Sequence, residues 1–311
     1  MLSFAITAAL LFISFVQSAG QEALRKPEPP VNDRQILLYV SVRPEFGPPI
    51  DSLKQDHFRI RTDSGDRQIT FFSDSPVPAS VAVLFDLSLS TPADALKEAT
   101  RALYLFRRAS LPTNQYLVAT FDEKDNVLMD WTNQEDMIVS TLDQVRNTKP
   151  KHETALYDAL YGAIERMNSA PQKRRVLILF SDGVNDGSRH YGFKETRELL
   201  KRSDVTLYVI GNNLNNSSDV MHAQDQMREL ADLSGGVAVF LSPEAKHSSY
   251  AQPIFDTFAY VAADLRYNYT LGFVPDKGGD GKWHPLRIVV DHPDLKARKI
   301  EVVGRTRKGY F

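Results

Sequence analysis

From Pro76 onward, short apolar segments alternate with longer amphipathic segments, and this alternation constrains the fold more than any other feature of the chain. Residues 80–85, 176–180 and 206–210 form nearly continuous apolar runs, without the regular polar alternation of a half-exposed strand. Such runs are typical of parallel strands covered by helices on both faces. We therefore predict an α/β domain with a doubly wound, mostly parallel sheet over residues 76–245.

The strands and helices of this domain follow from the spacing of its apolar residues. Strands are predicted at residues 80–85, 116–121, 176–180, 206–210 and 238–241, with a paired edge near residues 127–129. Helices are predicted at residues 93–108, 135–145, 155–167, 194–202 and 223–233. In the first helix, apolar side chains recur at helical spacing, so one face should pack on the sheet.

Both flanks of this domain have the pattern of β-structure. On the N-terminal side, short apolar or alternating runs at residues 36–42, 58–61 and 68–72 are separated by turn-forming residues, with a predicted hairpin turn at residues 63–66. On the C-terminal side, a helix at residues 253–265 precedes strands at residues 267–273, 285–290 and 299–303. We predict a small β-sandwich shared by residues 35–75 and 246–311, into which the α/β domain is inserted.

The first twenty residues carry no charged side chain and contain an apolar run from Leu2 to Val16. This pattern predicts a secretory signal peptide at residues 1–20, followed by a polar, proline-rich linker at residues 21–34. An uncleaved N-terminal membrane anchor is the alternative. No later segment reaches the roughly 20 apolar residues of a membrane span. We therefore expect a secreted protein, or one of the bacterial periplasm or cell envelope.

Charge and composition exclude several kinds of partner and site. The formal net charge is −2, from 37 basic and 39 acidic side chains, which disfavours nucleic acid as a partner. The chain contains no cysteine, so any metal must bind to oxygen or imidazole. The seven histidines show no metal-ligand spacing. The sequence therefore favours an oxygen-lined site, and it does not specify an oligomeric state.

Polar side chains follow two of the predicted buried strands. Asp86, Ser88 and Ser90 follow the first, and Asp182 follows the strand at residues 176–180. Ligands of open α/β sheets bind at the carboxyl ends of the strands, so both aspartates should meet at one edge. Buried carboxylates repel each other, and a hard cation is the simplest way to hold both. Mg²⁺ fits this oxygen-only set best.

These residues resemble the metal-ion-dependent adhesion site of von Willebrand factor type A domains. The matching positions are Asp86-x-Ser88-x-Ser90, then Thr154, then Asp182 before a glycine. The resemblance implies that the serine and threonine hydroxyls and both aspartates hold Mg²⁺, with Mn²⁺ or Ca²⁺ as alternative ions. It also implies that an open coordination position receives an acidic side chain from a partner protein.

A narrower resemblance covers nearly the whole chain after the linker. The segments at residues 53–60, 68–72, 265–273 and 307–310 are similar to those of exported von Willebrand A-related proteins known from Acidobacteria. Three departures from the adhesion-site pattern stand out. Leu89 replaces a usual glycine, Thr91 replaces a usual methionine, and His152-Glu153 replace two glycines before the threonine. We expect these departures to change affinity or ion preference more than fold.

The function predicted from the sequence is metal-dependent protein recognition or adhesion, without enzymatic activity. One alternative is a structural envelope module whose metal site is degenerate or does not exchange its ligands. A second is a serine hydrolase that uses Ser88 with His152 and Asp182, although the usual hydrolase motifs are absent. A third interpretation is that Asp86, Ser88 and Ser90 only cap the following helix.

Overall fold

The computed structural model describes residues 35–44, 47–150, 153–211, 217–240, 251–276 and 279–311. The predicted signal peptide and linker at residues 1–34 lie outside these ranges, so the structure does not bear on them. In the described part of the chain, no helix has the length and apolar character needed to cross a membrane.

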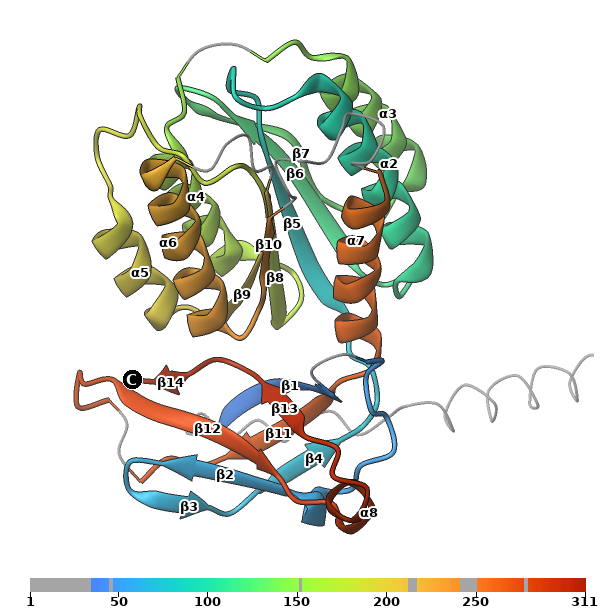
Figure 1. The fold of residues 1–311 in the computed structure, drawn as a ribbon, viewed down its shortest axis with the longest axis vertical. Helices are drawn as coiled ribbons and strands as arrows, with labels where there is room; N and C mark the ends of the chain where they lie inside the picture. The colour runs from blue at the N-terminus through green and yellow to red at the C-terminus, as the bar shows by residue number, and fades with distance from the viewer. Residues whose placement is uncertain (1–34, 45–46, 151–152, 212–216, 241–250, 277–278) are drawn as a thin grey trace, which may run out of the picture. The chain divides into compact units, whose positions relative to one another are not determined.

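The α/β part is built around a six-stranded sheet, which lies between two groups of helices in Figure 1. Its strand order is β10-β9-β8-β5-β6-β7. The strands are β5 (Ala79–Asp86), β6 (Gln115–Phe121), β7 (Asp125–Thr132), β8 (Arg174–Phe180), β9 (Val205–Gly211) and β10 (Ala238–Phe240). All neighbouring pairs are parallel except β6 and β7, which are antiparallel. The prediction of a mostly parallel sheet with a paired edge strand is confirmed.

Helices cover both faces of this sheet (Figure 1). One face packs against α2 (Ala93–Ala109), α3 (Glu135–Asn147) and α7 (Ala251–Arg266). The other face packs against α4 (Leu156–Arg166), α5 (Phe193–Arg202) and α6 (Ser218–Ser234), with the short 3₁₀ helix η2 (Met167–Ser169) after α4. All eight residues of the central strand β5 are buried, as the apolar run predicts.

The remaining strands form two four-stranded sheets whose inner faces share one hydrophobic core. One sheet has the order β13-β1-β11-β4 and the other β14-β12-β2-β3. The N-terminal strands are β1 (Ile36–Pro44), β2 (Phe58–Thr62), β3 (Gly65–Arg67) and β4 (Phe71–Ser73), with η1 (Gln55–His57) before β2. The C-terminal strands are β11 (Tyr269–Phe273), β12 (His284–Val290), β13 (Val302–Arg305) and β14 (Gly309–Tyr310), with α8 (Pro293–Ala297) after β12.

Each sheet of this sandwich combines strands from both ends of the chain. Strand β1 pairs antiparallel with β11, with Leu38 opposite Leu271, and β2 pairs antiparallel with β12, with Ile60 opposite Ile288. This confirms a β-sandwich built from N- and C-terminal strands around an inserted α/β domain. The domain limits at residues 75 and 245 stay predictions. Helix α7, assigned from the sequence to the C-terminal segment, packs on the central sheet.

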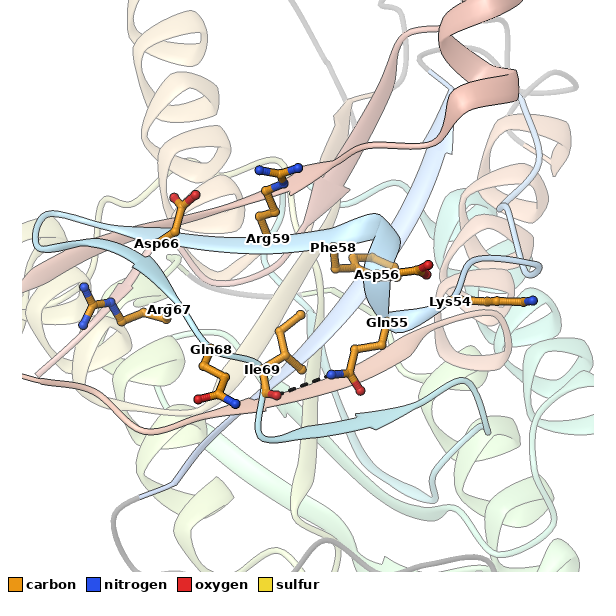
Figure 2. A pocket seen from close by; sticks show the side chains of 9 residues that line it. All are labelled: Lys54, Gln55, Asp56, Phe58, Arg59, Asp66, Arg67, Gln68 and Ile69. Carbon is orange, nitrogen blue, oxygen red and sulfur yellow. Dashed lines mark hydrogen bonds between the residues drawn. The ribbon is translucent and has the colours of Figure 1, made fainter.

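The sequence predicts one strand at residues 68–72, but these residues do not form a single strand in the structure. Strand β3 ends at Arg67 and pairs with β2, whereas β4 pairs with β11 in the other sheet. The chain changes sheets because Thr70 donates from its backbone nitrogen and its hydroxyl to the Gly272 carbonyl, at 2.7 and 3.1 Å. A pocket opens beside this crossing (Figure 2), where Gln55 Nε2 donates to the Ile69 carbonyl at 3.5 Å.

A buried carboxylate joins the end of α7 to strands of both parts. Asp264 is 1% exposed and accepts hydrogen bonds from the hydroxyls of Ser41 at 2.7 Å and Tyr208 at 3.1 Å. The same carboxylate forms an ion pair with Arg43, which is also buried. The Arg174 guanidinium donates to the backbone carbonyl of Asp264 at 3.1 Å. These contacts fix β1, α7, β8 and β9 to one another.

Candidate functional site

The candidate site lies where the neighbouring parallel strands β5 and β8 end. Phe85 and Phe180 are partners in the register of these strands, so the chain leaves both strands at the same level. Asp86 is the last residue of β5, and Asp182 follows β8 by two residues. The predicted convergence of two strand-end carboxylates at one sheet edge therefore has a direct cause in the register.

Asp86 is completely buried and accepts hydrogen bonds at both carboxylate oxygens. The Ser181 hydroxyl donates to Oδ2 at 2.7 Å, and the backbone nitrogen of Ser88 donates to Oδ1 at 2.9 Å. Burial raises the pKa of Asp86 to about 6, and the nearby charge of Asp182 also raises it. The hydrogen bonds from Ser88 and Ser181 oppose this shift without cancelling it.

Asp182 is the second buried carboxylate, with 2% of its surface exposed. Its Oδ1 accepts a hydrogen bond from the backbone nitrogen of Val184 at 2.9 Å. Burial raises its pKa, and hydrogen bonds from Val184 and from the Ser90 side chain oppose the increase. Within the described residues, neither Asp86 nor Asp182 forms an ion pair with a basic side chain. Both carboxylates are therefore desolvated without a neutralising cation from the described chain.

Hydroxyl groups lie close to these carboxylates. Ser88 is 1% exposed, and its Oγ lies 3.1 Å from the Oγ of the half-buried Ser90. Ser90, Thr154 and Asp182 line the same pocket, whose volume is about 670 Å³. Asp86 and Ser88 connect to this group through the hydrogen bonds just described. The structure thus brings together all five residues predicted from the sequence, and their role as metal ligands stays a prediction.

The loop that carries Thr154 is fixed by the loop that follows Asp182. The backbone nitrogen of Thr154 donates to Asp186 Oδ1 at 2.6 Å. The Thr154 carbonyl accepts from the backbone nitrogens of Asp186 at 3.2 Å and Gly187 at 3.0 Å. On its other side, Ala155 donates to the Asp122 carbonyl at 2.8 Å. These bonds determine where the Thr154 side chain, which is 3% exposed, can lie.

The structure rules out one of the simpler interpretations. Helix α2 has Pro92 as its N-cap residue, and no side chain forms a capping hydrogen bond there. Asp86, Ser88 and Ser90 therefore do not cap this helix, and the capping interpretation is wrong. The hydrolase alternative requires His152, which lies outside the described residues.

Two supporting residues were not identified from the sequence. Ser181 donates to Asp86 and accepts a hydrogen bond from the backbone nitrogen of Gly183 at 3.1 Å, so it links the two strand ends. Asp186 accepts a hydrogen bond from the backbone nitrogen of Thr154, so it joins the Thr154 loop to its own loop. The available signal was the preference of Ser and Asp side chains for bonding to nearby backbone amides in loops. That preference does not indicate which loop supplies the partner.

The donor set is chemically suited to a hard divalent cation. In the described part of the chain, no group of three or more His, Cys, Asp or Glu side chains could hold a metal ion. A cation here would therefore depend on hydroxyl oxygens as well as the two carboxylates. Mg²⁺ accepts such a set, since it usually binds one or two carboxylates and completes its shell with neutral oxygens. Asp86 and Asp182 are desolvated and have no ion-pair partner among the described residues, so their chemistry fits a bound Mg²⁺.

Comparisons with known proteins agree with the sheet and its helices. Residues 81–185 match the family model described as von Willebrand factor type A domain. A solved structure described as von Willebrand factor type A from Catenulispora acidiphila matches with a TM-score of 0.51 and 13% identity, over 76% of this chain and 70% of that chain. At this identity the match shows a shared fold. No curated protein matches the chain in sequence.

Two further solved structures are similar at lower scores. The von Willebrand factor domain of the type V pili tip protein Mfa5 from Porphyromonas gingivalis has a TM-score of 0.46 and 13% identity, over 60% of this chain and 97% of that chain. Proximal thread matrix protein 1 from the mussel byssus, described with a zinc-occupied MIDAS motif, has a TM-score of 0.47 and 18% identity. That match covers 65% of this chain and 48% of the mussel protein. Together with the match of residues 81–185 to the family model, the observed fold identifies this chain as a protein that contains a von Willebrand factor type A domain.

Proposed function

We propose that this protein recognises a partner protein in a metal-dependent manner, through a metal-ion-dependent adhesion site formed by Asp86, Ser88, Ser90, Thr154 and Asp182. The observation that carries the proposal is the pair of buried aspartates at the ends of β5 and β8, neither of which has an ion-pair partner in the described chain. Unpaired buried carboxylates are costly, so a protein rarely keeps two together without a ligand that needs them.

The chain's own residues divide the work of such a site. Asp86 and Asp182 would supply the negative charge that a divalent cation requires, and the hydroxyls of Ser88, Ser90 and Thr154 would supply neutral oxygens. Ser181 orients Asp86 through its 2.7 Å hydrogen bond, and the backbone of Val184 orients Asp182. When bound, Mg²⁺ would provide an open coordination position for a carboxylate of the partner. Mn²⁺ and Ca²⁺ are alternative occupants.

The same proposal covers activity and location. Recognition needs no chemical step at Ser88, so we propose a binding protein and not an enzyme. The charge-free, apolar residues 1–20 support export, and we propose that the protein acts outside the cytoplasm or in the bacterial envelope.

Calorimetric titration of Mg²⁺ into the metal-stripped protein tests the proposal, with Mn²⁺ and Ca²⁺ titrated in parallel. We expect saturable binding of one ion, and no binding by the Asp86→Ala variant. Asp256→Ala, at an exposed position of α7, is the matched control and should bind as the parent does. Absence of binding in the parent would contradict the proposal and favour a structural module without adhesion chemistry. Binding that remains unchanged in Asp86→Ala would place the metal elsewhere.

A further inference from the structure

Two tyrosine rings lie face to face on the α/β part, and neither belongs to the residues proposed to hold a metal. Tyr161 on α4 and Tyr191 in the loop between β8 and α5 have ring centroids 3.6 Å apart and an interplanar angle of 2°. In the described part of the chain, this is the only contact between two tyrosine rings. Tyr191 is 38% exposed and Tyr161 is half-buried, so the pair is open to reagents in solvent.

Asp158 fixes the loop so that the two rings overlap. Its Oδ1 accepts a hydrogen bond from the backbone nitrogen of Tyr191 at 2.7 Å, and its Oδ2 accepts one from that of Arg189 at 2.8 Å. The backbone nitrogen of His190 donates to the same carboxylate at 3.1 Å. Asp158 and Tyr161 are three residues apart on α4 and therefore share one face of the helix. The bonds to Asp158 bring the backbone of Tyr191 to the face that carries Tyr161.

The overlap of these rings is closer than ordinary aromatic packing. Aromatic pairs prefer offset or edge-to-face arrangements, with centroids about 4.5–7 Å apart. With centroids at 3.6 Å, the gap between the planes of Tyr161 and Tyr191 is no wider than this. It approaches the separation of about 3–3.5 Å at which bound reactants are poised to react. Because the π faces point at each other, a carbon–carbon bond perpendicular to both rings can form with little movement.

We propose that Tyr161 and Tyr191 are an oxidative modification site, at which a haem peroxidase with hydrogen peroxide as oxidant joins the two rings into a dityrosine. Each phenol loses one electron and one proton and becomes a phenoxyl radical. The radicals form one carbon–carbon bond between ring carbons ortho to the hydroxyls. The ortho hydrogens leave as protons and both oxygens regain a proton, which restores the aromatic rings. The two electrons and two protons released overall reduce one hydrogen peroxide to two waters.

The crosslink has a structural consequence for the chain. It joins α4 covalently to the loop between β8 and α5, which only hydrogen bonds to Asp158 and ring stacking are here seen to hold beside Tyr161. This inference does not depend on the metal-dependent recognition proposed above, because no step of it involves the candidate metal site.

Treatment of the protein with a haem peroxidase and hydrogen peroxide in EDTA, followed by trypsin digestion and mass spectrometry, tests the inference. Tyr191 is the only tyrosine in the tryptic peptide at residues 190–194, and Tyr161 lies in the peptide at residues 152–166. We expect one joined product of these peptides, with the summed mass less two hydrogen atoms, and dityrosine fluorescence in the monomeric protein. Tyr161→Phe and Tyr191→Phe should each abolish both signals, because phenylalanine keeps the ring but cannot form a phenoxyl radical.

Two further variants serve as a control and as a test of the loop. Tyr157 lies in the same peptide as Tyr161 but is buried, so Tyr157→Phe should leave the product unchanged. Asp158→Ala releases the loop and should lower the yield about tenfold, since a small misplacement of reacting groups costs at least that much in rate. A folded Asp158→Ala variant with the parent's yield would contradict the positioning role of Asp158.

The remaining outcomes decide the proposal itself. Dityrosine found only in covalent dimers, or only between other tyrosines, would overturn it, as would a joined product that survives in Tyr161→Phe. Absence of the joined product from the treated parent would also overturn it.

Discussion

Replacing Asp86 by Asn should stabilise the metal-free protein, although the residue is completely buried. The pKa of Asp86 is raised from 3.8 to about 6, chiefly by burial. A shift of about 2 units corresponds to about 3 kcal/mol of differential stability, since each unit is worth about 1.4 kcal/mol. Asn is nearly isosteric and uncharged, so it removes the cost of a buried carboxylate.

The hydrogen bonds of Asp86 allow this substitution. An Asn side chain can keep its oxygen on the backbone nitrogen of Ser88, which now donates to Oδ1 at 2.9 Å. The Ser181 hydroxyl, which now donates to Oδ2, can rotate to accept from the new amide group. The backbone nitrogen of Ser88 then keeps its acceptor, and the electrostatic gain should exceed the cost of rearranging the Ser181 hydroxyl.

The sign of the pH dependence follows from the direction of the shift. Because the folded state raises the pKa of Asp86, the folded state binds this proton more tightly than the unfolded chain does. The metal-free parent should therefore lose stability as the pH rises from about 4 to about 6. Above that window the Asp86→Asn variant should be more stable than the parent by up to about 3 kcal/mol, and below it the difference should vanish.

Urea unfolding in EDTA, repeated between pH 4 and pH 8, measures this difference directly. Asp256→Asn, an exposed change on α7, serves as the control and should follow the parent at every pH. Addition of Mg²⁺ should stabilise the parent by about 2.7 kcal/mol at a hundredfold excess over its dissociation constant, but should not stabilise Asp86→Asn. An Asn variant that is less stable than the parent at pH 8 in EDTA would refute the reasoning.

Three other perturbations test different parts of the structure. Asp264→Ala leaves the buried guanidinium of Arg43 without its partner and should cost about 3–5 kcal/mol in urea unfolding. His284 lies between two carboxylates whose hydrogen bonds raise its pKa, so the stability of the parent relative to His284→Gln should fall as the pH rises above 6.5. Asp186→Ala removes the acceptor for the backbone nitrogen of Thr154 and should weaken Mg²⁺ binding about tenfold in calorimetry, whereas Asp186→Asn should retain it.

The α/β part could be predicted because its signals are local. Strand β5 lies in the centre of the sheet with helices on both faces, so its apolar run identifies a buried parallel strand without any knowledge of its neighbours. The meeting of Asp86 and Asp182 follows in turn, since parallel strands bring their carboxyl ends to one edge. The aspartate positions were therefore implied once the strands were identified.

The β-sandwich was harder to predict, since its strands are short and their partners are distant in sequence. The run at residues 68–72 has the composition of one strand. The hydrogen bonds from Thr70 to Gly272 direct the chain away from β2, and the following strand β4 pairs with β11 in the other sheet. Strand β14 and helix α8 have only two and five residues, too few to show a period. Strand β14 forms by pairing with β12, and no local pattern encodes this pairing.

The two kinds of buried charge in this protein explain why one is structural and the other is a candidate binding site. Asp264 has a guanidinium and two hydroxyls as partners, so its charge is balanced within the chain and should hold α7 in place. Among the described residues, Asp86 and Asp182 have only hydroxyl and amide donors, and burial raises the pKa of both. No cation from the described residues balances their charge. The described residues neutralise the carboxylate of Asp264 but supply no cation to Asp86 and Asp182, and this contrast favours the proposal of a binding role for the two aspartates over a purely structural one.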